Sequence, residues 1–154
     1  MPSYALVADP DPVTSSGYAA MLRELGLTVF LVRGGTNAVA ALVERGVPAL
    51  LLTELTLPGQ TGIELIETLR RCAPASKTRV IAVSADRALR DRAAAWRGRL
   101  GISAILAKAA SEDSVQRVIR RLLEPAAAPA REPGVAEPLP DPWAGRAGKA
   151  RASS

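Results

Sequence analysis

The sequence has no histidine, only one cysteine and very few aromatic residues. Histidine is the commonest general base and a common zinc ligand, and with no histidine and a single cysteine we expect no structural zinc site. Cys72 has no second cysteine to pair with, which excludes a disulfide within the chain and fits a reducing cytoplasm. Because aromatic residues make up only 3% of the sequence, we expect Leu, Val, Ile and Ala to build the core.

We also expect no segment for membrane insertion or export. No apolar stretch approaches the ~20 residues that a membrane span needs, so no membrane insertion is expected. Residues 1–20 contain two aspartates and no leading positive cluster, unlike a signal peptide. We therefore predict a cytoplasmic protein whose 154 residues form one domain with an extension.

The composition changes after Leu123. Residues 1–123 hold 16 basic and 11 acidic side chains and so carry the whole formal net charge of +5. Residues 124–154 hold four of each sign and half of the chain's 12 prolines, which disfavour helices and central strands. We predict a domain over 1–123 and a disordered, Pro/Ala-rich tail over 124–154. The tail is either a solvated extension or a docking peptide anchored by Trp143.

Five apolar segments have the features of strands, and apolar residues at helical spacing fill the intervals between them. The expected strands are 4–8, 28–33, 49–53, 79–85 and 103–108, and three of them are continuous runs typical of buried parallel strands. The expected helices are 12–25, 36–45, 62–71, 86–99 and 111–123. Asp11 is the expected N-cap of the first helix, with Pro12 at its first position, and Ser111 that of the last. Strict alternation predicts an α/β fold with a doubly wound parallel sheet.

Four polar side chains stand at the carboxyl ends of these strands, where such sheets bind their ligands. Asp9 follows the first strand and Glu54 the third, while Ser84 and Lys108 end the fourth and fifth. In a sheet of strand order 2-1-3-4-5, the switch point lies between the first and third strands. We therefore expect Asp9 and Glu54 to face one crevice, with Ser84 and Lys108 beside it.

Four motifs resemble, in order, the receiver domain of bacterial two-component response regulators over residues 4–123: LVADPDP, LLTELTLPGQTG, VIAVSA and ILAK. The resemblance implies a flavodoxin-like (βα)5 fold and a role in phosphorelay signal transduction. It also implies that Asp9 belongs to the acidic pocket, that Ser84 is the switch hydroxyl and that Lys108 is the pocket lysine. These three residues match the family pattern.

Four positions depart from the family pattern. Glu54 replaces the phosphoacceptor Asp, Pro10 replaces the second acid of the pocket, and Ile105 and Ala109 replace an aromatic switch residue and a proline. Glutamate is one methylene longer than aspartate, and a displacement of ~1 Å can lower a rate ~10²-fold. Pro10 offers no ligand to Mg²⁺, and Asp11 is expected to cap a helix instead. We expect no catalytic residue, no enzyme activity, no metal site and no cofactor, with at most weak Mg²⁺ binding.

The charge on Glu54 leaves three interpretations open. An ion pair between Glu54 and Lys108 could mimic the phosphorylated state, could be an inert scaffold, or could leave room for residual phosphorylation. Either Ile105 deprives the switch of a ring that can reorient, or it simply packs against the helix 86–99. We therefore expect the face formed by helix 86–99, strand 103–108 and helix 111–123 to keep one conformation rather than to switch between two.

A basic surface is expected on this same face, which the resemblance implies is the usual site of partner binding. Its arginines are Arg87, Arg90, Arg92, Arg97, Arg99, Arg117, Arg120 and Arg121. They would attract an acidic protein, or would simply pair with Asp86, Asp91 and Asp113. We predict a degenerate, stand-alone receiver that acts as a phosphorylation-independent protein-interaction module in bacterial signalling or localisation. The alternatives are an active phosphoacceptor receiver and, less favoured for want of a helix-turn-helix, a nucleic-acid-binding adaptor. The partner and the oligomeric state stay open.

Overall fold

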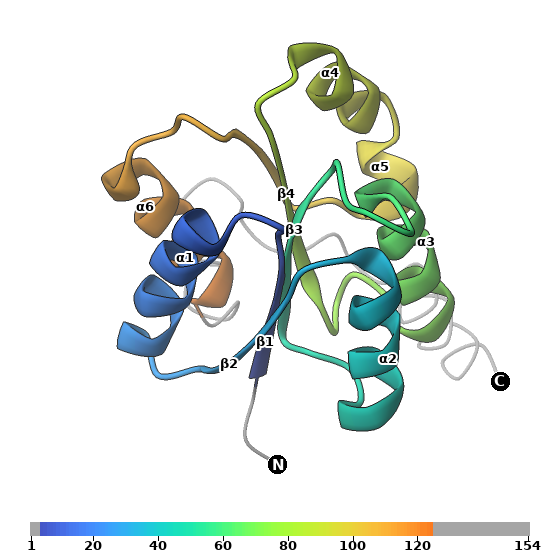
Figure 1. The fold of residues 1–154 in the computed structure, drawn as a ribbon, viewed down its shortest axis with the longest axis horizontal. Helices are drawn as coiled ribbons and strands as arrows, with labels where there is room; N and C mark the ends of the chain where they lie inside the picture. Colours follow the sequence, from blue (N-terminus) through green and yellow to red (C-terminus); the bar gives the residue numbers. More distant parts are fainter. Residues whose placement is uncertain (1–3, 125–154) are drawn as a thin grey trace, which may run out of the picture. The chain divides into compact units, whose positions relative to one another are not determined.

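The computed structural model describes residues 4–124, and a parallel sheet runs through their centre (Figure 1). The strands lie in the order β2-β1-β3-β4-β5, which confirms the predicted fold class. Their bounds are Tyr4–Ala8 (β1), Thr28–Val32 (β2), Leu50–Glu54 (β3), Arg79–Ser84 (β4) and Ala104–Ala107 (β5). The predicted tail with its Trp143 anchor lies outside the described residues, apart from Glu124.

Six helices cover the two faces of the sheet in the described part of the chain. They are α1 (Pro12–Glu24), α2 (Gly35–Arg45), α3 (Gly62–Cys72), α4 (Arg87–Ala95), α5 (Arg97–Leu100) and α6 (Glu112–Leu123). Figure 1 shows α1 and α6 on one side of the sheet and the helices from α2 to α5 on the other. None of these six helices is long and apolar enough to cross a membrane.

The prediction of one continuous helix over 86–99 is wrong, because the structure divides this segment into α4 and α5. The break falls at Trp96, whose backbone angles of φ −100° and ψ 4° leave the helical region. Arg70 of α3 donates from Nε to the Leu100 carbonyl at 2.7 Å and from Nη2 to the Gly101 carbonyl at 2.9 Å. These bonds satisfy carbonyl groups at the end of α5 and hold this short helix against α3.

The helix caps predicted at Asp11 and Ser111 are confirmed. Asp11 precedes α1, and its Oδ1 accepts a hydrogen bond from the N–H of Val13 at 3.0 Å, with Pro12 at the first helical position. Ser111 Oγ accepts from the N–H of Ser114 at 3.1 Å at the start of α6. Each cap satisfies a backbone donor that has no partner within its helix.

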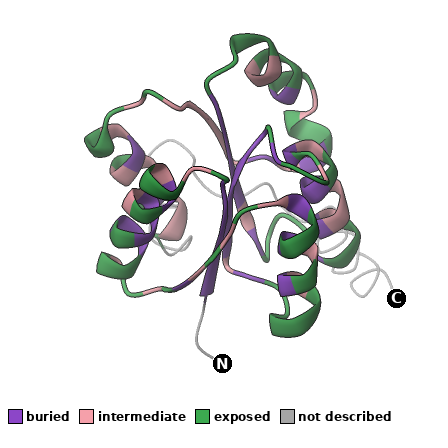
Figure 2. Cartoon of the chain, in the orientation of Figure 1, coloured by how far each residue is buried: buried purple, intermediate pink, exposed green. Residues whose placement is uncertain are grey.

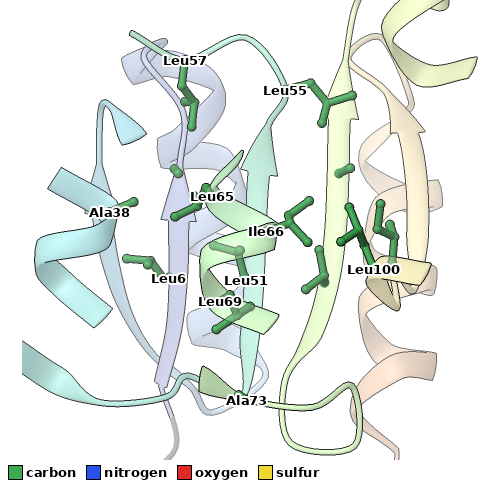
Figure 3. Packing of buried hydrophobic residues seen from close by; sticks show 14 of the residues in the cluster. Leu6, Ala38, Leu51, Leu55, Leu57, Leu65, Ile66, Leu69, Ala73 and Leu100 are labelled. Carbon is green, nitrogen blue, oxygen red and sulfur yellow. The ribbon is translucent and has the colours of Figure 1, made fainter. Parts of the chain in front are cut away.

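The core lies between the central strands and the helices (Figure 2). Every residue of β1 and β3 is buried, which explains why these strands are continuous apolar runs in the sequence. On the α2/α3 side, Leu6 and Leu51 from the strands join Leu65, Ile66 and Leu69 of α3 in one cluster (Figure 3). Aliphatic side chains thus supply most of the core, as the low aromatic content predicts.

Candidate functional site

Three charged side chains meet at the carboxyl edge of the sheet. Asp9 follows β1, Glu54 ends β3 and Lys108 follows β5. The ammonium Nζ of Lys108 lies 2.7 Å from Asp9 Oδ2 and 2.9 Å from Glu54 Oε1. Lys108 therefore bridges both carboxylates, and the ion pair expected between Glu54 and Lys108 is present. These three residues form the charge cluster.

The second oxygen of each carboxylate accepts hydrogen bonds from the backbone. Asp9 Oδ1 accepts from the N–H of Asp11 at 2.8 Å. Glu54 Oε2 accepts from the N–H of Leu55 at 2.9 Å and from that of Thr56 at 3.3 Å. Because Lys108 donates to the other oxygen of each acid, all four carboxylate oxygens of the charge cluster have a partner.

The charge cluster is largely shielded from solvent. The exposed fraction of the side chain is 0% for Asp9, 9% for Glu54 and 21% for Lys108. Burial opposes the charged form of Lys108, but the hydrogen bonds and charges of Asp9 and Glu54 outweigh it. The pKa of Lys108 therefore lies above its ordinary value of 10.5. Lys108 is therefore an ammonium group at neutral pH, and it supplies the positive charge that lies between the two acids.

Tyr18 of α1 is a neighbour of the charge cluster that sequence reasoning missed. Burial raises the pKa of its phenol, the charge of Lys108 opposes this shift, and the charges of Asp9 and Glu54 reinforce it. Together with Lys108, Tyr18 lines a cavity of about 200 Å³ beside α1. Helical spacing could have found Tyr18, since it stands four residues before the buried Leu22 on the same stripe.

The other two residues of the predicted acidic pocket do not add carboxylates to the cluster. Pro10 is exposed. The carboxylate of Asp11 turns to α1, where it accepts from the Thr14 hydroxyl at 2.5 Å and the Val13 N–H at 3.0 Å. These two hydrogen bonds lower the pKa of Asp11. Among residues 4–124, no group of three or more Asp, Glu or Cys side chains is placed to hold a metal ion.

The two switch positions have separate surroundings. Ser84 is buried, and its Oγ accepts from the N–H of Asp86 at 3.0 Å, at the start of α4. Ile105 is half-buried and packs against the hydrophobic core. The carboxylate of Glu54 takes its hydrogen bonds from Lys108 and the backbone that follows it, so Ser84 organises α4 rather than the charge cluster.

The predicted basic surface is partly tied down by hydrogen bonds. Arg90 donates to the Ser84 carbonyl at 2.7 Å, and Arg97 donates to the Ser103 carbonyl at 2.8 Å. The alternative that these arginines pair with aspartates is wrong, because no arginine lies within 4.0 Å of the carboxylates of Asp86, Asp91 or Asp113 in the described part of the chain. Five of the predicted arginines stay exposed and make neither an ion pair nor a side-chain hydrogen bond in that part: Arg87, Arg92, Arg117, Arg120 and Arg121.

Close packing fixes the turn between β3 and α3. The residues responsible were not singled out from the sequence. Gly62 donates its N–H to the Leu55 carbonyl at 3.0 Å, and a Cβ at Gly62 would lie 2.4 Å from the carbonyl oxygen of Glu54. Thr61 and Glu64 form a capping box. The N–H of Thr61 donates to Glu64 Oε1 at 2.9 Å, and the N–H of Glu64 donates to Thr61 Oγ1 at 3.2 Å. The spacing Thr-x-x-Glu was the available signal. This packing fixes the turn whose backbone N–H groups, at Leu55 and Thr56, donate to the Glu54 carboxylate.

Comparison with known proteins identifies the family. Residues 5–120 match the model of the response regulator receiver domain, so the chain belongs to this family. It is a receiver domain of two-component signalling. A protein from Leptolyngbya boryana, described as an uncharacterized 14.6 kDa protein in the sodA1 3' region, is 34% identical over 92 residues. That match covers 60% of this chain and 70% of the other protein.

Solved structures of receiver domains share the fold. The signal receiver domain of an HD domain-containing protein from Pseudomonas fluorescens Pf-5 matches with a TM-score of 0.69 at 22% identity, covering 80% of this chain and 95% of the other. The chemotaxis response regulator CheY4 of Vibrio cholerae matches with a TM-score of 0.68 at 15% identity, covering 80% and 100%. At these identities the likeness shows the fold alone.

Proposed function

We propose that this receiver domain is degenerate and works as a phosphorylation-independent protein-interaction module in bacterial signalling or localisation. The observation that carries the proposal is the Lys108 bridge between Asp9 and Glu54. It fills the phosphoacceptor position of the family with a permanent carboxylate whose oxygens all have partners. The domain then presents the same surface to its partner whether or not a phosphodonor is present.

The donor set does not fit Mg²⁺, on which phosphoryl transfer to a carboxylate depends. Magnesium requires near-ideal octahedral geometry at ~2.0–2.1 Å and is held mainly by carboxylates and waters. Asp9 has both oxygens engaged, Pro10 has no carboxylate, and Asp11 caps α1 with both of its oxygens. We therefore assign no phosphoryl-transfer step to this site.

The contacts of Glu54 favour a fixed scaffold over a mimic of the phosphorylated state. A mimic that acts through the switch hydroxyl would engage Ser84, but Ser84 Oγ accepts from the N–H of Asp86. At the other switch position, Ile105 packs against the core and has no ring to reorient. Two carboxylates held by one partly buried ammonium and by backbone N–H groups favour a single arrangement.

The proposed partner is an acidic protein that binds the face formed by α4, β5 and α6. Five exposed arginines on α4 and α6 give this face an excess of positive charge: Arg87, Arg92, Arg117, Arg120 and Arg121. Such a field raises the association rate with an acidic partner and weakens in high salt. Trp143 in the tail stays a second candidate anchor, outside the described residues.

The test compares the natural chain with a variant that restores the acids of the family. Glu54→Asp combined with Pro10→Asp shortens one acid and adds another, so we expect calorimetry to show Mg²⁺ binding at least ~10-fold tighter than in the natural chain. Glu54→Asp alone is the matched control, because it still lacks the second acid. The natural chain, incubated with Mg²⁺ and acetyl phosphate, should keep its unmodified mass.

Two results would contradict this proposal. One is a covalent phosphate on Glu54, located by mass spectrometry of peptides after treatment with acetyl phosphate. The other is a Mg²⁺-dependent spectral response of the natural chain to beryllofluoride. Either result would favour an active phosphoacceptor receiver.

A further inference from the structure

A second concave surface lies between the β3–α3 turn, α3 and α4. Its apolar walls come from Leu55 and Leu57 of the turn, Ile63 of α3, Leu89 of α4, and Trp96 between α4 and α5. Its volume is about 330 Å³, which lies in the range of pockets that bind small ligands. This surface is the α3–α4 groove. It differs from the face formed by α4, β5 and α6 because α3 and the β3–α3 turn form one of its walls, and Arg92 of α4 is the one arginine that the two surfaces share.

One cation that lines the α3–α4 groove has no partner in the described part of the chain. Arg92 is exposed, and no carboxylate within residues 4–124 lies within 4.0 Å of its guanidinium. Glu64 also lines the groove, but its Oε1 accepts from the N–H of Thr61 at 2.9 Å and from its hydroxyl at 3.2 Å. The acid of the groove is therefore engaged, while the base is available to a ligand.

The charge around the groove is complementary to an anion. Residues 86–100 carry five arginines and two aspartates, a formal excess of +3. One of the aspartates, Asp86, is engaged as the N-cap of α4. Arg99 does not line the groove, but its guanidinium carbon lies 5.2 Å from the centroid of the Trp96 ring and its Nη2 lies 3.8 Å from Glu67 Oε2. A positive field beside an aromatic and aliphatic surface attracts a ligand that is both acidic and apolar.

We propose that the α3–α4 groove binds a peptide segment of a partner protein in which a leucine- or phenylalanine-sized side chain lies next to an acidic residue. The apolar side chain enters between Ile63, Leu89 and Trp96, and the carboxylate pairs with Arg92. This inference goes beyond the function proposed above. The groove uses neither the charge cluster nor α6, and it would bind its peptide even if Glu54 accepted a phosphate.

The experiment selects ligands by their chemistry. A random heptapeptide library displayed on phage is panned against the full chain at low salt, and an enriched sequence is then synthesised as a capped peptide. We expect enriched peptides to combine one large apolar residue with Asp or Glu within two positions. Trp143→Phe leaves Trp96 as the single tryptophan of the chain, so binding in the groove should shift the fluorescence emission of Trp96.

A pair of matched variants separates the groove from the neighbouring basic face. Arg92→Glu reverses a charge in the groove, and Arg117→Glu makes the same change at an exposed site on α6 outside it. We expect Arg92→Glu to weaken peptide binding about 5- to 10-fold and Arg117→Glu to weaken it less than about 2-fold. Circular dichroism checks that both variants are folded.

Several outcomes would overturn the proposal. The library could yield no enriched peptide, or peptides that are basic or lack a large apolar residue. Equal losses of affinity in Arg92→Glu and Arg117→Glu would place the ligand on the face formed by α4, β5 and α6. A peptide that binds without changing the emission of Trp96 would likewise bind elsewhere. Because these readouts do not involve phosphate or Mg²⁺, failure here is distinguishable from failure of the proposed function.

Discussion

Replacement of Lys108 by methionine tests the charge cluster directly. Methionine keeps most of the length of the side chain but removes the ammonium group that lies 2.7 Å from Asp9 and 2.9 Å from Glu54. Two carboxylates are then left in a largely buried site without a counter-charge. Removing one partner of a buried ion pair typically costs about 3–5 kcal/mol. Since 21% of the Lys108 side chain is exposed, we expect a smaller loss of about 2–4 kcal/mol in the free energy of unfolding.

The loss in Lys108→Met should depend on pH in a defined direction. Two adjacent carboxylates without a cation favour uptake of a proton by one of them in the folded state. The folded variant then binds more protons than its unfolded chain, so its stability rises as the pH falls from about 7 toward about 5. In the natural chain the raised pKa of Lys108 acts at the other end of the scale. Its contribution is complete below 10.5 and is lost as the pH rises through the folded-state pKa.

Urea denaturation at pH 7 and pH 5 measures this prediction. Lys77→Met is the matched control, because Lys77 is exposed and makes no ion pair within residues 4–124. A difference of less than about 0.5 kcal/mol between the two variants at pH 7 would refute the reasoning, since that is the usual effect of a surface substitution. A deficit in Lys108→Met that is as large at pH 5 as at pH 7 would also refute it.

Two further predictions concern the segments that hold the site and the groove. Gly62→Ala should destabilise the chain by about 1–3 kcal/mol, because the new Cβ would lie 2.4 Å from the Glu54 carbonyl oxygen. Gly17→Ala is the control, because its new Cβ would meet no atom within 4 Å outside the adjacent residues and the backbone of α1. Equal melting temperatures of the two variants would contradict the close packing. Arg70→Met should lower stability by about 2–3 kcal/mol and speed hydrogen exchange in α5, since it removes the hydrogen bonds to the end of that helix. Arg71→Met is its exposed control, and unchanged exchange in α5 would rule out this clamp.

The parts of the fold that follow from local pattern could be predicted from the sequence. Continuous apolar runs predicted the buried strands, and the alternation with helices predicted a doubly wound parallel sheet. The strand order that the structure confirms came from the flavodoxin-like fold that the resemblance implies. The meeting of Asp9, Glu54 and Lys108 followed from the same topology, because the ends of parallel strands share one edge. Proline next to a short acid was enough to place the Asp11 cap.

Features that depend on contacts between distant segments could not be predicted in this way. The sequence around Trp96 keeps an ordinary helical pattern, so it gives no sign of the break there. The donors that hold α5 come from Arg70 on another helix. The partner of Ser84 is a backbone N–H two residues later, which residue identity alone does not reveal. Charge counting suggested that arginines pair with nearby aspartates, whereas Arg90 and Arg97 donate to backbone carbonyls.

The bridge made by Lys108 also bears on the order in which the chain assembles. Lys108 is 99 residues from Asp9 and 54 residues from Glu54, so both contacts are slow, non-local ones. A growing chain that has paired β1 with β3 but has not yet added β5 holds two acids together with no cation between them. When β5 pairs with β4, Lys108 reaches the two acids and removes this repulsion. The last strand therefore stabilises the pairing of the strands that formed before it. A fragment that ends before β5 should therefore stay loose, however well its own three central strands are specified.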